Sequence, residues 1–433
     1  MGRGAGDEED LTPLPVERGA GQEATSSVGA EAPPGERFAV RRSRSWWVAG
    51  LVGLAAVLVG AAALSGPDRK HVATPASHPP ATGESAATVP AGVDEPAPQD
   101  WRRGAAGPLY HRDFAAQVWT GHELVVWGGD PDGDSGAAYD PKADAWRAIA
   151  PAPIPARCQG ASAWTGHEVV VWGRACRLTP GPSPGRSRYA TAGAAYDPVA
   201  DRWRVIPAGP IEAGSVTTSV WTGGQWVVFN PVSPTGAFDP ASGHWRILPP
   251  VPRPFASIAA QWTGREVVVL GTEILEKGPS AVGASYRHWT AALDLGTGRW
   301  RELPQPPLEL GATAVWDGRR LIAWDQNLNA AALDPSAGTG WQNLAALPVD
   351  FTDCSPQGAR LGAVVFAEQC GQGVLWRPWD QTWERVTHPK SLAEVPVWTG
   401  EDALFWVGRF AGSADGIWLY HPPRTPDRGA DPG

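Results

Sequence analysis

One pattern of apolar and polar positions recurs along the chain from about residue 119 to residue 420. Its first half is Trp-Thr-Gly followed by an apolar run, as in Trp119-Thr120-Gly121 and residues 124–127. Its second half is an aromatic residue, Asp and Pro, followed by a single Trp, as in Tyr139-Asp140-Pro141 and Trp146. Self-similarity at a period of roughly 40–50 residues is the signature of a repeat architecture.

Both halves of the pattern can be counted. The first half begins at Trp119, Trp164, Trp221, Trp262, Trp316 and Trp398, and a degenerate copy around residues 360–366 fills the double gap before Trp398. In the second half the last Trp follows its partner by seven residues in the pairs Tyr139/Trp146, Tyr196/Trp203, Phe238/Trp245, Leu293/Trp300 and Trp376/Trp383. The pair Leu333/Trp341 is spaced by eight. The count predicts seven repeats.

Each repeat predicts four short strands. The first is rich in small residues, as in residues 160–163, which suits the innermost strand of a radial sheet. The second is apolar on both faces, as in residues 169–172, which is expected where neighbouring sheets cover both sides. The third ends at the Asp-Pro turn, and the fourth carries the single Trp. We therefore expect an all-β fold, a seven-bladed β-propeller of four-stranded blades.

The two ends of the repeat region predict how the ring closes. The last hairpin begins at Trp398, its third strand ends at Tyr420, and no Trp strand follows. The segment Asp100-Trp101-Arg102 resembles the fourth strand around Trp203. We expect the strand at Trp101 to complete the seventh blade, because closure removes the exposed sheet edges that invite aggregation.

The pattern resembles the kelch repeat and the kelch-type propeller of the galactose oxidase central domain. The residues that carry the resemblance are Gly128-Gly129 after the second strand, Tyr139, Trp146, and the Pro-rich exit at residues 151–153 that leads to Arg157. The resemblance covers residues 100–422 and implies a kelch-like propeller there. The sequence departs from the family in keeping the double glycine in the first repeat alone.

A separate apolar segment precedes the repeats. Residues 46–64 carry no charge, a length that spans a hydrocarbon core of about 30 Å as a helix. Trp46 and Trp47 stand where interfacial aromatic residues belong, and the arginine cluster at residues 37–44 precedes them. We expect an uncleaved single-pass anchor in the cell membrane, with the N-terminus cytoplasmic and the propeller extracellular. The alternative is a cleaved signal peptide, because Ala61-Ala62-Ala63 resembles a cleavage site.

The remaining segments are predicted to be disordered. Residues 1–45 form a cytoplasmic tail, residues 65–99 a Pro- and Ala-rich stalk, and residues 423–433 a polar C-terminal tail. The net charge of −9 resides partly in the first 36 residues, and the propeller holds no basic stripe. We expect no nucleic-acid partner.

The four cysteines are predicted to pair within hairpins. Cys158 and Cys354 each stand eight residues before a turn glycine, and Cys176 and Cys370 follow the next strands. Folding each hairpin about its turn brings Cys158 opposite Cys176 and Cys354 opposite Cys370. Two disulfides fit an oxidising compartment outside the cytoplasm. Zinc binding is the alternative, but no His or acidic cluster accompanies either pair, and we expect no metal site.

The loops between strands two and three, and those between one blade and the next, build one rim. Two of them are long, residues 173–191 and 271–289, and loops on a rigid scaffold are the usual location of binding residues. The candidate binding residues of this rim are Arg112, Arg157, Arg174, Arg177, Arg253 and His288. The alternatives are that the loops are solvated insertions, and that Arg112 and Arg157 pair locally with a carboxylate or a loop carbonyl. We favour local pairing for these two arginines.

No catalytic residues and no cofactor are predicted. Copper chemistry of the galactose oxidase type would need a Tyr linked to a Cys, and the predicted disulfides use all four cysteines. The Asp-Pro aspartates recur in nearly every repeat, which marks them as turn residues. The leading hypothesis is a non-enzymatic module that binds a protein or an envelope glycan, held at the membrane by residues 46–64. The alternatives are a carbohydrate-active enzyme outside the cytoplasm and a sensor that signals through its N-terminal tail.

Overall fold

The computed structural model describes residues 100–129, 135–176, 179–180, 187–188, 191–211, 218–231, 234–276, 285–309, 311–349, 355–369, 371–387, 395–407 and 416–425. The predicted cytoplasmic tail, anchor and stalk at residues 1–99 lie outside the described residues, as do residues 426–433 of the predicted C-terminal tail. Among the described residues, no helix has the length and the apolar character that a membrane crossing needs.

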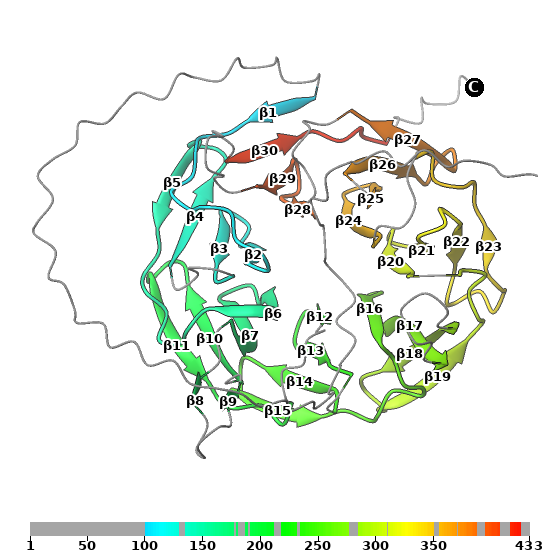
Figure 1. Cartoon of the computed structure of the whole chain (residues 1–433), viewed down its shortest axis with the longest axis horizontal. Coiled ribbons are helices and arrows are strands. Elements are labelled where there is room, and N and C mark those ends of the chain that lie inside the picture. Colours follow the sequence, from blue (N-terminus) through cyan, green and yellow to red (C-terminus); the bar gives the residue numbers. More distant parts are fainter. Residues whose placement is uncertain are drawn as a thin grey trace, which may run out of the picture. The chain divides into compact units, whose positions relative to one another are not determined.

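The described residues form seven four-stranded antiparallel sheets set around a common axis, a seven-bladed β-propeller (Figure 1). Blade 1 is β2 (Ala116–Trp119), β3 (Leu124–Trp127), β4 (Gly136–Asp140) and β5 (Ala145–Ala148). Blade 2 is β6 (Arg157–Trp164), β7 (Val169–Ala175), β10 (Thr191–Asp197) and β11 (Arg202–Ile206), with a small β8 (Thr179–Pro180) and β9 (Ser187–Arg188) sheet between β7 and β10. Blade 3 is β12 (Thr218–Trp221), β13 (Trp226–Phe229), β14 (Gly236–Asp239) and β15 (His244–Ile247).

The next three blades follow the same order. Blade 4 is β16 (Ser257–Trp262), β17 (Val267–Glu276), β18 (Ser285–Asp294) and β19 (Arg299–Leu303). Blade 5 is β20 (Thr313–Trp316), β21 (Leu321–Trp324), β22 (Ala330–Leu333) and β23 (Gln342–Asn343). Blade 6 is β24 (Gln357–Leu361), β25 (Val364–Gln369), β26 (Gln372–Arg377) and β27 (Thr382–Val386).

Blade 7 joins the two ends of the described chain, as the sequence predicts. It consists of β28 (Val397–Trp398), β29 (Ala403–Trp406), β30 (Ile417–Tyr420) and β1 (Trp101–Arg103). Trp101 pairs with Tyr420 across β1 and β30, which lie side by side in Figure 1. The first strand of each blade contacts the first strands of both neighbours, and β2 contacts β28, so the ring is closed.

The core lies between adjacent sheets, which explains why the second strands are apolar on both faces. Val125 and Trp127 pack with Val169 and Val171 of blade 2. The alternate residues Leu124 and Val126 of the same strand pack with blade 7. Successive side chains of a strand point to opposite faces, and here each face meets another sheet.

The recurring Asp-Pro segment is a turn, as predicted. Asp140 Oδ1 accepts a hydrogen bond from the backbone N–H of Lys142 at 2.8 Å. The same contact recurs at Asp197, Asp239, Asp294 and Asp334. An Asp side chain that bonds the backbone two residues on stabilises such a turn, so these carboxylates have a structural role.

The second half of the repeat sets a cross-strand pair in each blade. The aromatic residue of the third strand lies opposite the Trp of the fourth, as in Tyr139 and Trp146, whose ring centroids are 5.1 Å apart. Blade 5 departs from this pattern: its fourth strand is the two-residue β23, and Trp341 lies just before it. The longer spacing between Leu333 and Trp341 coincides with this shortened strand.

The fourth-strand indoles also join neighbouring blades. Each indole N–H donates to a backbone carbonyl of the preceding blade, four residues after the corresponding Trp. The six bonds are Trp146 to Ala105 at 2.9 Å, Trp203 to Ala150 at 2.8 Å, Trp245 to Pro207 at 3.0 Å, Trp300 to Pro249 at 3.2 Å, Trp341 to Pro304 at 2.8 Å and Trp383 to Ala345 at 3.0 Å. Trp101 is the exception in the described ring, since its buried Nε1 has no hydrogen-bond partner there.

These bonds predict a difference between two otherwise matched substitutions. Trp203 and Trp101 each contact two aromatic rings, but only the Trp203 indole bonds the preceding blade. Trp203→Phe should therefore lower the free energy of unfolding by about 1 kcal/mol more than Trp101→Phe, the usual net value of one hydrogen bond. Urea unfolding of both variants measures the difference, and equal losses would show that the indole bonds do not join the blades.

Candidate functional site

The rim predicted to bind a partner contains arginines that hold loops. Arg112 is buried, and its guanidinium donates to both the carbonyl and the hydroxyl oxygen of Ser135 at 2.7 Å. It thereby ties the chain before β2 to the segment that follows β3. This is the local pairing that the sequence interpretation favours for Arg112.

Arg157 and Arg174 lie on the first two strands of blade 2. Arg157 is buried at the start of β6, and its carbonyl accepts the backbone N–H of Gly129 in blade 1 at 3.2 Å. Arg174 lies on β7 in register with Cys158. Arg177 lies outside the described residues.

The structure describes the side chain of one of the four cysteines. Cys176 is disulfide-bonded, its backbone N–H donates to the carbonyl of Ala156 at 3.1 Å, and no described cysteine is free. The side chains of Cys158, Cys354 and Cys370 lie outside the described residues, so both pairings stay predictions.

The segment 271–289, predicted as a long loop, is largely a continuation of the sheet in blade 4. β17 and β18 extend through it to Glu276 and from Ser285, and Glu273 on one strand forms an ion pair with Arg287 on the other at 2.5 Å. Opposite charges on facing strands stabilise an antiparallel pair, so these residues favour strand over loop.

Arg253 and His288 line one small cavity of about 280 Å³ in blade 4. Arg253 is exposed and forms an ion pair with Glu302 at 3.3 Å. His288 is buried, with Nδ1 at 3.0 Å from Thr272 Oγ1 and Nε2 against the carbonyl of Glu309. Burial lowers the pKa of His288, although the Glu309 carbonyl acts in the opposite direction. This imidazole is therefore neutral and joins blade 4 to the segment before blade 5.

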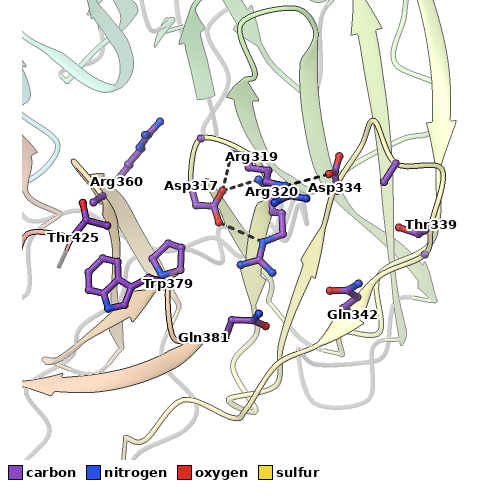
Figure 2. Close-up of a pocket in the computed structure, with 15 residues that line it drawn as sticks. Asp317, Arg319, Arg320, Asp334, Thr339, Gln342, Arg360, Trp379, Gln381 and Thr425 are labelled. Atoms are coloured by element: carbon purple, nitrogen blue, oxygen red, sulfur yellow. Dashed lines mark hydrogen bonds and ion pairs between the residues drawn. The ribbon is translucent and has the colours of Figure 1, made fainter. Parts of the chain in front are cut away.

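A cavity among the described residues lies on the opposite rim, between blades 5 and 6. It measures about 800 Å³ and is bordered by the turn after β20, the turn after β22 and the chain after β26 (Figure 2). Its side chains include Asp317, Arg319, Arg320, Asp334, Thr339, Gln342, Arg360, Trp379, Gln381 and Thr425. We call it the blade 5/6 cleft.

The cleft is explained by a pair of residues that recurs in blades 1 to 4. The residue at the start of the second strand bonds the residue that follows the Trp of the fourth strand. The pairs are Glu123 with Arg147, Glu168 with Arg204 at 2.5 Å, Gln225 with Arg246 at 2.8 Å and Glu266 with Arg301 at 2.8 Å. We call this the Glu–Arg pair.

Three of these arginines also reach the next blade. Arg147 donates to the carbonyl of Pro198 at 3.5 Å, and Arg301 donates to that of Pro335 at 3.3 Å. Arg246 does the same at Leu295, which takes the place of the proline. The side chain therefore occupies the space between two blades at their turn ends.

Blade 5 carries the two residue types in exchanged places. Arg320 stands where blades 1, 2 and 4 have Glu, and Gln342 stands where blades 1 to 4 have Arg. The bond to the next blade would join residue 342 to Pro378, and both residues instead line the blade 5/6 cleft. The shorter amide leaves open a space that an arginine fills in the earlier blades.

Three guanidinium groups border the cleft. Arg320 Nε lies 3.6 Å from Asp317 Oδ2, and its guanidinium carbon lies 5.9 Å from the Trp376 ring centroid in blade 6. Arg319 Nε lies 3.8 Å from Asp334 Oδ2. Arg360 comes from blade 6, and its Nε donates to the carbonyl of Gly362 at 2.9 Å.

The two carboxylates of the cleft are already hydrogen-bonded by their own turns. Asp317 Oδ1 accepts the backbone N–H groups of Arg319 at 2.8 Å and Arg320 at 2.6 Å. Asp334 Oδ1 accepts the hydroxyl of Ser336 at 2.6 Å, and that bond holds the pKa of Asp334 below its usual range. With three arginines and two carboxylates, the lining side chains carry a net positive charge.

Sequence reasoning missed this cleft, although its signal was present. Blade 5 carries Asp317 where most copies have Thr, Arg320 in place of Glu, and the irregular spacing before Trp341. The sequence alone does not show that these positions are neighbours. The sheet brings them together by placing the ends of β21 and β23 on one side of the same blade. Within the described ranges, no group of three or more His, Cys, Asp or Glu side chains is placed to hold a metal ion.

Comparison with known proteins supports the fold. No protein-family model matches the chain, and no curated protein matches it. Among solved structures, YCF48 bound to D1 peptide aligns with a TM-score of 0.51 at 13% identity, over 78% of this chain and 99% of that one. The structure of YjhT aligns with a TM-score of 0.45 at 15% identity, over 65% of this chain and 99% of that one. At 13% identity the likeness to YCF48 shows the propeller fold alone.

The burial of the predicted arginines predicts different losses of stability for two substitutions. Arg112→Met should lower the free energy of unfolding by about 2–3 kcal/mol, because it leaves buried loop acceptors without their charged donor. Arg253→Met breaks an exposed ion pair and should cost at most about 1 kcal/mol. Urea unfolding distinguishes them, and a loss at Arg253 as large as that at Arg112 would contradict the burial-based assignment.

The buried imidazole predicts an acid-dependent loss of stability. Because burial lowers the pKa of His288 in the folded state, the unfolded chain binds that proton more readily as pH falls through about 6.5. The free energy of unfolding should therefore decrease more steeply with falling pH for the natural protein than for His288→Asn. His122→Gln, which removes an exposed turn histidine, should keep the natural slope. An unchanged slope in His288→Asn would contradict the assignment.

Proposed function

We propose that this chain is a membrane-anchored, non-enzymatic interaction module whose kelch-like propeller binds a partner protein outside the cytoplasm. The observation that carries the binding part is the blade 5/6 cleft, where blade 5 lacks the Glu–Arg pair of blades 1 to 4. Residues that close a joint elsewhere in the ring border an open cavity here.

The chemistry of the cleft is that of recognition. Apart from Asp317 and Asp334, its polar side chains are guanidinium groups, amides, hydroxyls and one indole, which at neutral pH donate hydrogen bonds or carry a fixed charge. The carboxylate of Asp334 is held ionised by its turn, which makes it a poor acid or base near neutral pH. This favours binding over proton transfer and therefore over the carbohydrate-active enzyme.

A similar fold has been solved with a peptide bound, since YCF48 is a propeller in complex with a D1 peptide. The identity of 13% limits this likeness to the fold. It supports only the general point that a protein of this fold can bind a peptide, and leads us to favour a protein over an envelope glycan.

The location rests on the sequence and on one cysteine. The uncharged segment 46–64 follows four arginines, which favours a cytoplasmic N-terminus and an extracellular propeller. The disulfide at Cys176 favours an oxidising compartment, and we propose the pairs Cys158–Cys176 and Cys354–Cys370. Residues 65–99 would then be the stalk between membrane and propeller.

Binding of the full-length protein to an array of peptides and envelope glycans tests the proposal. We expect saturable binding to peptides, and loss of that binding when Thr339→Trp fills the cleft. The matched control is Thr297→Trp, an exposed residue of the corresponding turn in blade 4. Binding to glycans alone, or turnover of a glycan, would overturn the binding part.

Protease treatment of intact cells that express the protein with a tag at each end tests the location. We expect loss of the C-terminal tag and protection of the N-terminal tag, both on one membrane-bound chain. Release of the propeller into the medium would show that residues 46–64 are a cleaved signal.

A further inference from the structure

We propose that the blade 5/6 cleft binds an acidic side chain of an extended peptide segment, with Arg320 as the principal partner of the carboxylate. This inference rests on the proposed function, because it names the chemistry of the ligand that the propeller binds. It starts from the exchanged residues of blade 5, where an arginine stands in the place of the usual glutamate.

The guanidinium of Arg320 is only partly used by the protein itself. Its side chain is 15% exposed and is held between Asp317 and the ring of Trp376. The contact with Asp317 involves Nε, and Figure 2 shows the two terminal nitrogens pointing into the cleft. Among the described residues, no hydrogen-bond acceptor is found for these two nitrogens, and a mostly buried charged donor is strongly stabilised by an ionised acceptor.

Asp317 does not satisfy this arginine. Its Oδ1 accepts two backbone N–H groups of its own turn, and the Arg320 contact at 3.6 Å is longer than a charge-assisted hydrogen bond. A ligand carboxylate would meet the forked pair of terminal nitrogens, the geometry in which arginine recognises carboxylates. The ligand's carboxylate would thus pair with Arg320, as a glutamate pairs with an arginine in blades 1, 2 and 4.

Two further arginines flank this position from different blades. Arg319 extends from the blade 5 turn with 83% of its side chain exposed. Arg360 of blade 6 lies across the same turn, since a Cβ at Gly318 would be 2.8 Å from its Nη2. Gly318 also has a φ of +108°, a backbone conformation that favours glycine in this turn.

The wall of the cleft suits a peptide backbone. The edge strand β23 is two residues long and exposed, and the chain at residues 338–340 before it is exposed as well. An exposed edge strand presents backbone N–H and C=O groups that an added extended segment can pair. The amides of Gln342 and Gln381 offer both donors and acceptors beside this edge.

The cleft is long enough for a segment rather than a single residue. A second cavity of about 540 Å³ extends over blade 7, and Ala363 and Thr425 line both cavities. The second cavity is bordered by Trp398, His421 and Arg424. An extended peptide anchored at Arg320 can therefore continue across the turn of blade 6.

The decisive variant gives blade 5 the Glu–Arg pair of blades 1, 2 and 4. In Arg320→Glu/Gln342→Arg the new arginine should bond the new glutamate and occupy the cleft, as Arg301 does in blade 4. The fold should be retained, as thermal unfolding checks, because the pair is native to this propeller. Arg320→Gln is the milder second variant.

The probes are array peptides that contain Glu or Asp, their Gln or Asn twins, and an oligogalacturonate, each measured against the full-length protein. We expect the acidic peptides to bind at least about tenfold more tightly than their twins, and the double variant to lose about the same factor. Arg265→Gln, which occupies the turn position of Arg319 in blade 4 and changes the net charge equally, should leave binding unchanged.

The outcomes separate the failure of the carboxylate site from the failure of the proposed function. Equal binding of acidic peptides and their twins, or full binding by the double variant, overturns the carboxylate site while the proposed function stands. Preference for the oligogalacturonate overturns the peptide assignment. Absence of binding to any peptide overturns the proposed function itself.

Discussion

The joint between neighbouring blades is the contact on which the rest of this propeller depends. Each blade alone is a four-stranded sheet with two apolar faces, and only the next blade removes those faces from water. The joint is then fixed at the outer edge by the fourth-strand indole and, in blades 1 to 4, on the turn side by the Glu–Arg pair. In blades 1 and 2, Asp144 and Asp201 add a bond to the backbone N–H of the same residue, Ala105 or Ala150, that accepts the indole.

This arrangement explains where the molecule has room for a ligand. In blades 1, 3 and 4 an arginine crosses to a carbonyl of the next blade, and the space between the turns is filled. Between blades 5 and 6 the exchange of Arg320 and Gln342 removes that crossing. The result is both a cavity and a cation with unused donors. One local change thus creates the shape of the site and its charge together.

Much of the fold could be predicted from the sequence because the repeat encodes it several times over. The pairing of Tyr139 with Trp146 follows from a fixed spacing across a turn, and the strand at Trp101 follows from the missing Trp after Tyr420. The site could not be predicted in the same way. For Arg112 the sequence favours the local pairing that the structure has, but not its burial. His288 is a candidate by residue type and loop position, neither of which reveals that it is buried and hydrogen-bonded by the protein. Arg320 and Gln342 lie far apart in the pattern, and only the register of blade 5 brings them to one joint.

Hydrogen–deuterium exchange tests most directly the claim that the blade 5/6 joint is open and is the place of binding. In the free protein, backbone amides at residues 338–343 should exchange faster than the corresponding amides of blades 1, 2 and 4. Saturation with an acidic peptide should slow exchange there and in residues 317–320 and 360–363. Exchange as slow as in the other blades, or protection confined to the rim of Arg112 and His288, would contradict the account.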